Sequence, residues 1–297
     1  MMQPGGGYGS GFVVALVGAS ADGEEAIALA GGRIGERIGW DGVPGEAATV
    51  LVVEAEGVAD AVLADALPGL AAIADARGRA VVATIAVDQI DLVAAELLGA
   101  RVILLCAPTL AERVAAVAVA AGIGDTPGFV REDERERLRR MNEEVARIAG
   151  LLARLVEAPD AGDGAVEDRR LGYSVAAAQA QAPVAAADVR RTIRARRMRA
   201  QYFDARLVED PGWDMLLDLF ASELERGQVS VSSLCIAAAV APTTALRWIS
   251  RMVAAGLFAR MPDAGDKRRA FLVLTPAASA AMHGYADAVR RGGLPIV

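Results

Sequence analysis

The chain has 297 residues, of which 54% are hydrophobic and only 4% aromatic, and its formal net charge is −7 at pH 7. This length suits two domains of ordinary size, and this apolar content excludes a chain that is disordered throughout. Charged residues interrupt every apolar run short of a membrane span. Residues 1–11 also lack the basic start and apolar centre of a signal peptide. We therefore expect a cytoplasmic protein with no membrane partner.

The charge is distributed unevenly along the chain. Residues 1–188 carry a net charge of −13, whereas residues 189–297 carry +6. An acidic body joined to a basic domain is expected when only the basic part approaches a polyanion.

Few residues of the types used for metal binding or nucleophilic catalysis are present. Cys106 and Cys235 lie far apart, each in an apolar stretch, which indicates small core residues rather than a disulfide or a zinc site. His283 is the only histidine, and we expect a partly exposed helix residue there. The sequence thus predicts no catalytic residue, no metal, no cofactor and no enzymatic activity.

Four apolar runs near the N-terminus predict strands buried on both faces. They cover residues 12–18, 49–53, 80–86 and 101–106. Stretches with helical periodicity, such as 60–76 and 91–98, separate them. Alternating strands and helices indicate an α/β domain with a parallel sheet.

The carboxyl ends of these strands are where such a sheet binds ligands. The turn from Gly18 to Gly23 has neither the glycine pattern nor the lysine of a phosphate-binding loop. Glu54 and Glu56 close the second run. They could form a metal site, but we favour solvated acids because no second acidic cluster follows the first strand.

Residues 12–122 resemble a degenerate receiver domain of two-component response regulators, which has a flavodoxin-like sheet. Gly18-Ala19-Ser20 stands where receivers have an acidic pair, Glu54 stands at the phosphoacceptor position, and Ala107-Pro108 replaces Lys-Pro. The stretch 31–48 looks too short for the second strand and helix of a receiver. The resemblance implies that residues 1–125 form a pseudo-receiver that is not phosphorylated. Such a domain would serve dimerisation or bind a signalling protein or a small ligand.

A heptad pattern follows the predicted α/β domain. Apolar residues recur at alternating spacings of three and four with charged flanks, which is typical of a coiled coil. They are Leu138, Met141, Val145, Ile148, Leu152 and Leu155. We predict a coiled-coil helix over 126–158 that makes a homodimer; the alternative is a single amphipathic helix lying on the first domain.

Residues 159–186 have no apolar period and predict a flexible linker, so that a second domain covers 187–297. Six arginines lie between Arg190 and Arg199. They favour equally a solvated helix and contacts with phosphate groups, for which Arg194 and Arg197 are the candidates.

The second domain carries successive signals for helix starts and stops. Asp210-Pro211 predicts the start of a helix that stops at Gly227, and Ser230 predicts the start of a short second helix. The turn at 241–244 starts a third helix, which ends at Gly256. Two helices joined by a tight turn indicate a helix-turn-helix.

The third predicted helix has two different faces. Its apolar face is formed by Ala245, Trp248, Ile249, Met252 and Val253. Its polar face has no acids and consists of Thr243, Thr244, Arg247, Ser250 and Arg251. Hydrogen-bonding and cationic groups without carboxylates are what a DNA recognition helix presents to the major groove. We interpret Trp248 as a core residue rather than an intercalator.

Two short strands, 257–261 and 270–274, predict a β-hairpin, and Thr275-Pro276 then starts a last helix that reaches Arg291. The hairpin tip carries the basic residues Lys267, Arg268 and Arg269. Such a wing can reach the DNA backbone or minor groove.

Residues 203–290 resemble the winged helix of multiple-antibiotic-resistance-regulator (MarR) type proteins. Gly256-Leu257, the wing pattern from Asp263 to Arg268, and Leu274-Thr275-Pro276 carry the resemblance. It implies binding of double-stranded DNA by an α+β winged helix-turn-helix. It also implies that Asp266 braces the wing through an arginine and that Arg268 enters the minor groove.

These observations favour a dimeric DNA-binding transcriptional regulator with a pseudo-receiver domain. The alternative is a protein-interaction adaptor that uses both domains to bind partners. An α/β enzyme fused to a DNA-binding domain is disfavoured because no catalytic constellation is present.

Overall fold

The computed structural model describes residues 11–124, 184–263, 265, 266 and 269–294. The described residues belong to one compact unit. The six predicted coiled-coil residues, most of the predicted linker, and the wing residues Lys267 and Arg268 lie outside the described residues.

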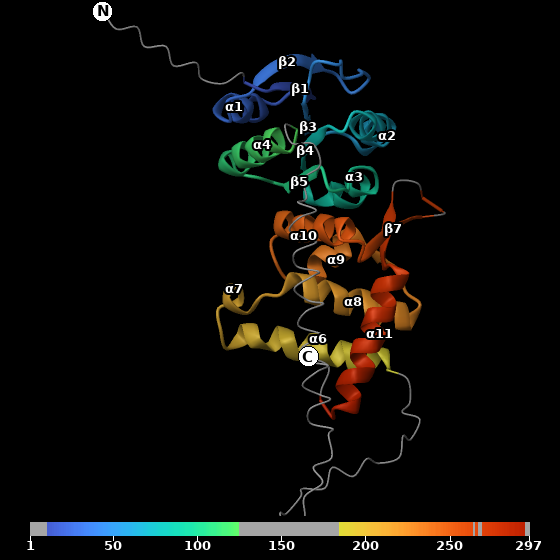
Figure 1. Ribbon diagram of the computed structural model, residues 1–297. Coiled ribbons are helices and arrows are strands. Elements are labelled where there is room, and N and C mark those ends of the chain that lie inside the picture. The colour runs from blue at the N-terminus through green and yellow to red at the C-terminus, as the bar shows by residue number, and fades with distance from the viewer. Residues whose placement is uncertain (1–10, 125–183, 264, 267–268, 295–297) are drawn as a thin grey trace, which may run out of the picture. The chain divides into compact units, whose positions relative to one another are not determined.

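The N-terminal part is a parallel sheet of five strands in the order β2-β1-β3-β4-β5 (Figure 1). The strands are β1 (Val13–Val17), β2 (Arg33–Ile38), β3 (Val50–Glu54), β4 (Ala80–Ile85) and β5 (Val102–Cys106). Every residue of β3 and β4 is buried, because helices cover both faces of the sheet. This explains the unbroken apolar runs, and the predicted α/β class is confirmed.

Two pairs of helices cover the sheet (Figure 1). One pair is α1 (Ala21–Leu29) with α4 (Leu110–Gly124); the other is α2 (Asp60–Ala76) with α3 (Ile90–Glu96), which follows a 3-10 turn at Val87–Gln89. Alternate side chains of each strand enter opposite cores: Val14 and Leu16 pack with Ile27, whereas Ala15 and Val17 pack with the other cluster.

The prediction for residues 31–48 is half wrong. The structure has a strand there, β2, paired in parallel with β1 at the sheet edge, but no helix between β2 and β3. Exposed and half-buried residues alternate along β2 because an edge strand is covered less than a central one. The charged residues of β2, including Arg33 and Glu36, interrupt the kind of continuous apolar run from which the other strands were predicted. Charged side chains are typical of strands at the edge of a sheet.

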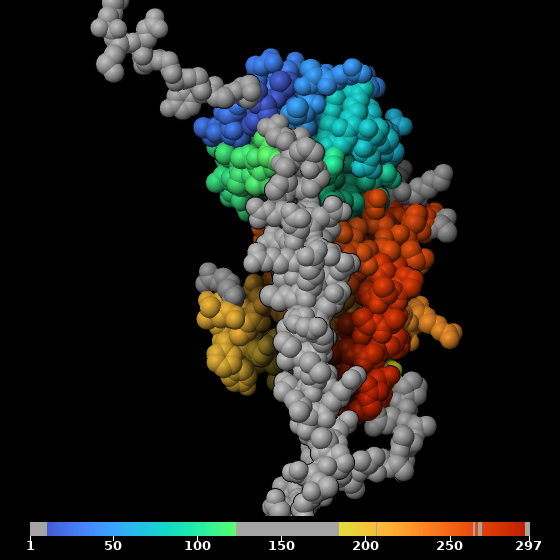
Figure 2. All heavy atoms as spheres, in the orientation of Figure 1, coloured from blue at the N-terminus to red at the C-terminus, as the bar shows by residue number. Residues whose placement is uncertain are grey.

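The C-terminal part is helical with a small antiparallel sheet in the order β6-β8-β7. Its helices are α6 (Ala186–Met198), α7 (Ala205–Val208), α8 (Pro211–Glu225), α9 (Val231–Ala237), α10 (Pro242–Ala254) and α11 (Pro276–Arg291), with a 3-10 turn at Arg199–Gln201. Its strands are β6 (Val229–Ser230), β7 (Phe258–Pro262) and β8 (Ala270–Leu274). Helix α11 lies at the surface (Figure 2).

The predicted helix starts in this part are confirmed by their caps. The side chains of Asp210, Ser230 and Thr275 accept hydrogen bonds from backbone N–H groups in the first turns of α8, α9 and α11. These bonds satisfy donors that a helix start otherwise leaves free. Helix α8 ends at Glu225. Arg226, which follows it and precedes the predicted stop at Gly227, adopts a left-handed conformation with φ of 57°.

Both cysteines are buried and unpaired, as predicted. No single helix of the described residues is long and apolar enough to cross a membrane. Helices α9 and α10 meet the length and composition criteria only when taken together, across a bend of 109°.

Candidate nucleic-acid interface

Helices α9 and α10 have the geometry of a helix-turn-helix. They are separated by a break of at most four residues and are inclined at 109°, within the range typical of that motif. Ser230 caps the first helix, and Pro242 occupies the first turn of the second, where its fixed φ and missing N–H are tolerated. The turn predicted from the sequence is therefore present.

The two faces of α10 differ as predicted. Ala245, Leu246, Ile249 and Met252 are buried, and Leu246 is a core residue that the predicted apolar face omitted. On the other face Arg247 and Arg251 are exposed, whereas Thr243, Thr244 and Ser250 are half-buried. The helix contains no acid, so its outer surface is positively charged.

Trp248 is half-buried at the edge of this face. Its ring packs against Gly212, where an added β-carbon would lie 3.1 Å from a ring atom. The guanidinium of Arg251 stands 4.8 Å from the ring centroid. This cation-π contact holds the charge of Arg251 beside the face that bears Arg247, and the close approach to Gly212 agrees with a packing role for Trp248.

The described part of the wing is ordered by short contacts across its base. The N–H of Asp263 donates to the carbonyl of Arg269 at 3.1 Å. The Asp266 carboxylate lies 3.8 Å from Nε of Arg269. Both side chains of this pair are well exposed, so the pair contributes little stability. The geometry is nevertheless that of an acid placed beside an arginine within the wing.

The arginines of α6 divide into two groups. Arg190 is paired with Asp218 and Glu225, and Arg196 with Asp214, so these two fasten α6 to α8. The hydrogen bond to Glu225 raises the pKa of Arg190 and lowers that of Glu225. Arg194 and Arg197 are exposed, and Arg197 makes only a long bond of 3.4 Å to the carbonyl of Ala237. These two are the arginines that the sequence singled out for phosphate contacts.

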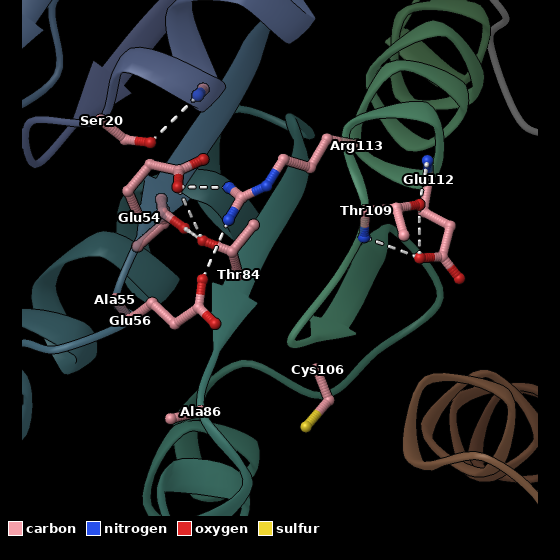
Figure 3. Close-up of polar contacts among 12 residues, drawn as sticks. Ser20, Glu54, Ala55, Glu56, Thr84, Ala86, Cys106, Thr109, Glu112 and Arg113 are labelled. Atoms are coloured by element: carbon pink, nitrogen blue, oxygen red, sulfur yellow. Dashed lines mark hydrogen bonds and ion pairs between the residues drawn. The ribbon is translucent and has the colours of Figure 1, made fainter.

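The carboxyl edge of the parallel sheet holds a buried ion pair that the sequence did not predict (Figure 3). Glu54 is only 6% exposed, so the expectation of a solvated acid is wrong for it. Its carboxylate accepts hydrogen bonds from Nη1 of Arg113 and, at 2.9 Å, from the Thr84 hydroxyl. Arg113 also donates to the exposed Glu56 at 2.9 Å. A buried carboxylate needs such partners because it has lost its water.

Gly23 of α1 packs closely against the carboxylate of Glu54. A β-carbon added at Gly23 would lie 2.8 Å from the Glu54 carboxylate, so the space beside the acid is filled. Ser20, at the position of a receiver's acidic pair, instead caps α1 by accepting from the N–H of Gly23. No group of side chains in the described residues could hold a metal ion.

Thr243, a predicted DNA contact, is engaged by the α/β domain. Its hydroxyl oxygen accepts from the N–H of Cys106, the last residue of β5, at 3.0 Å. The same hydroxyl lies 3.3 Å from the Cys106 carbonyl oxygen, to which it donates. The structure therefore places the start of α10 against the end of β5.

Comparisons with known proteins add little. No protein-family model matches the chain, and no curated protein matches it. Among solved structures, the chain is similar to apo (heme-free) PefR at 17% sequence identity, over 35% of this chain and 91% of that chain, with a TM-score of 0.21.

Proposed function

We propose that the chain is a DNA-binding transcriptional regulator with a C-terminal winged helix of the MarR type. The observation that carries the proposal is α10, the second helix of a helix-turn-helix, which exposes Arg247 and Arg251 on a face without acids. A helix that enters the major groove must present cationic and hydrogen-bonding groups to base edges and phosphates. An ordinary surface helix of so acidic a protein would mix charges of both signs.

Within this proposal the side chains of α10 contact base edges, and those of the wing and of α6 contact the DNA backbone or the minor groove. Arg247 lies in the middle of α10, where a long side chain reaches a guanine edge, and Thr243, Thr244, Ser250 and Arg251 surround it on the same helix. Lys267, Arg268 and Arg269 on the wing supply contacts to the backbone or the minor groove. The exposed Arg194 and Arg197 of α6 are further phosphate contacts. The heptad residues 138–155 hold two copies together, so that the dimer binds two half-sites.

The N-terminal domain acts in this proposal as a regulatory domain, not as an enzyme. Glu54 takes the phosphoacceptor position and is occupied by Arg113 and Thr84. A phosphoryl group would need an aspartate open to solvent and a cation to bind it. Aspartyl phosphorylation is therefore not the signal, and the domain responds to a protein or a small ligand.

The experiment is binding of the full-length chain to fragmented genomic DNA at physiological salt with competitor, followed by sequencing of the bound fragments. On the selected site Arg247→Ala should cost about 1–3 kcal/mol and relax the base preference at one position. Arg268→Ala should weaken binding to cognate and scrambled duplexes alike and make the salt dependence shallower by about one phosphate contact.

Arg33→Ala is the matched control. It removes the same charge from an exposed arginine of β2, in the α/β domain. If Arg247→Ala and Arg268→Ala bind both duplexes as Arg33→Ala does, this face does not touch DNA.

One observation favours the second candidate, a protein-interaction adaptor. The start of α10 here binds a protein surface, through the bonds between Thr243 and Cys106. An adaptor would enrich no DNA fragment in the same experiment.

A further inference from the structure

The α/β domain contacts the helix-turn-helix and the wing strand at residues that would face DNA. The first contact is that of Thr243, which stands at the second position of α10. The N-terminal residues of a recognition helix are those that contact base edges. While its hydroxyl is bonded to the backbone of Cys106, Thr243 cannot reach a base.

The second contact involves the first helix of the motif. Asp91, in the first turn of α3, accepts hydrogen bonds from the N–H of Ser232 at 2.8 Å and from its hydroxyl at 2.6 Å. Ser232 lies in the first turn of α9. The first helix of a helix-turn-helix crosses the DNA backbone, and the Asp91 carboxylate would repel phosphates there.

The third contact involves the strand that leads into the wing. Nη1 of Arg260 in β7 donates to the carbonyl oxygen of Ala95 at 2.7 Å and lies 3.3 Å from those of Ala94 and Glu96. These are the last carbonyls of α3, which have no partner inside the helix. A cation is favourable at such a helix end. Arg260 thus neutralises the end of α3 and holds the base of the wing.

We propose that the α/β domain is a built-in inhibitor of DNA binding. It holds the recognition helix, the first helix and the wing strand through β5 and α3, and DNA binds only after these contacts open. The proposal rests on the proposed function, because it assumes that this surface binds DNA. The signal for opening is then any ligand or partner protein that binds the α/β domain more tightly in the open form than in the closed form.

The strength of the inhibition follows from the fraction of open molecules. Apparent affinity for DNA falls in proportion to that fraction, so each tenfold shift toward the closed form weakens binding tenfold. The three contacts join residues between 137 and 166 positions apart in the chain. Asp91 and Ser232 are half-buried polar residues outside the apolar cluster that the two parts share, so severing their hydrogen bonds should leave that cluster in place.

A reversible crosslink tests the proposal in the full-length chain. The side chains of Asp91 and Ser232 touch at 2.6 Å, so the double variant Asp91→Cys with Ser232→Cys places one thiol on each side of the contact, and diamide is used to join them as a disulfide. Diamide, as the oxidant, takes up the two hydrogen atoms released, and dithiothreitol reverses the reaction. Intact mass and peptide mapping verify the bond. The single variants Asp91→Cys and Ser232→Cys, treated with diamide in the same way, are the controls.

The readout is binding of a fluorescein-labelled mixed-sequence DNA duplex. The reduced double variant lacks the native hydrogen bonds and should bind DNA about tenfold more tightly than the wild type. The crosslinked double variant should bind DNA at least about tenfold more weakly than the wild type. Asp91→Ala, which removes the acceptor without adding a thiol, should bind more tightly as well. The single variants should not respond to diamide.

Three results would overturn the proposal, and they can be told apart. If the crosslinked chain binds DNA as well as the reduced chain, the contact does not inhibit, while DNA binding itself stands. If the two thiols are joined neither by diamide nor by a short bis-methanethiosulfonate, whose spacer covers a longer gap and which dithiothreitol also reverses, the contact is not populated in solution. If the crosslink forms but neither form binds DNA, the proposed function fails, and the inhibition fails with it.

Discussion

Removal of Arg113 should reveal what the buried ion pair of the α/β domain contributes. The side chains of Arg113 and Glu54 are 7% and 5% exposed, and Thr84 is the other side chain bonded to Glu54. In Arg113→Met the Glu54 carboxylate stays buried with a hydroxyl as its only partner. Leaving one charge of a buried pair unpaired costs about 3–5 kcal/mol. We expect a loss of that size in the free energy of unfolding, measured by urea denaturation with far-ultraviolet circular dichroism.

A second variant separates the cost of an unpaired charge from the value of the pair. Glu54→Leu with Arg113→Met removes both charges, and replacing a buried pair by apolar residues is often neutral or stabilising. The double variant should therefore regain most of the stability that Arg113→Met loses. The Thr84 hydroxyl keeps a weaker acceptor in the Val53 carbonyl at 3.5 Å.

The surface pair Arg37 and Glu24 is the matched control. It also joins an arginine to a glutamate, through two bonds of 2.7 and 3.1 Å, but its side chains are 61% and 44% exposed. Because water solvates both charges, Arg37→Met should leave the urea midpoint unchanged. If Arg113→Met costs no more than Arg37→Met, burial does not make the difference and the reasoning is refuted.

Two further predictions concern phosphorylation and assembly. Incubation with acetyl phosphate should leave the intact mass of the chain unchanged, and a gain of one phosphoryl group that disappears in Glu54→Gln would contradict this. Val145→Asp with Ile148→Asp should dissociate the proposed homodimer, because unpaired charges at heptad core positions are strongly unfavourable. Light scattering measures the mass of both proteins, and an unchanged mass would assign dimerisation to another surface.

The elements that the sequence predicted well are those with local signals. Three helices begin with a capping residue whose side chain accepts a hydrogen bond from the backbone N–H three residues later. These capping residues are Asp210, Ser230 and Thr275. The same holds for the apolar runs of β3 and β4, which are buried on both faces and carry one polar residue each, Glu54 and Thr84. Edge strand β2 was missed because its positions are exposed or half-buried, so that charged residues are tolerated there and no continuous apolar run marks the strand.

The buried pair was missed because it depends on packing between distant segments. Glu54 and Arg113 are 59 residues apart and meet only when α4 crosses the end of β3. The available signal was Arg113 in the first turns of α4, a helix whose only other charged residue is Glu112. It indicates a buried or paired guanidinium but does not name the partner, since Glu54 and Glu56 both lie within reach.

The contacts of Thr243 likewise depend on a distant segment of the chain, and they concern a predicted functional residue. From the sequence this threonine belongs to a recognition face, because its type and its place on an acid-free helix suit a base edge. In the structure it bonds to Cys106, 137 residues away. A polar side chain that suits DNA also suits any backbone that offers an N–H and a carbonyl together, as Cys106 does. Under the proposed function, a domain of the same chain covers the DNA-binding face, and the two uses of Thr243 exclude one another.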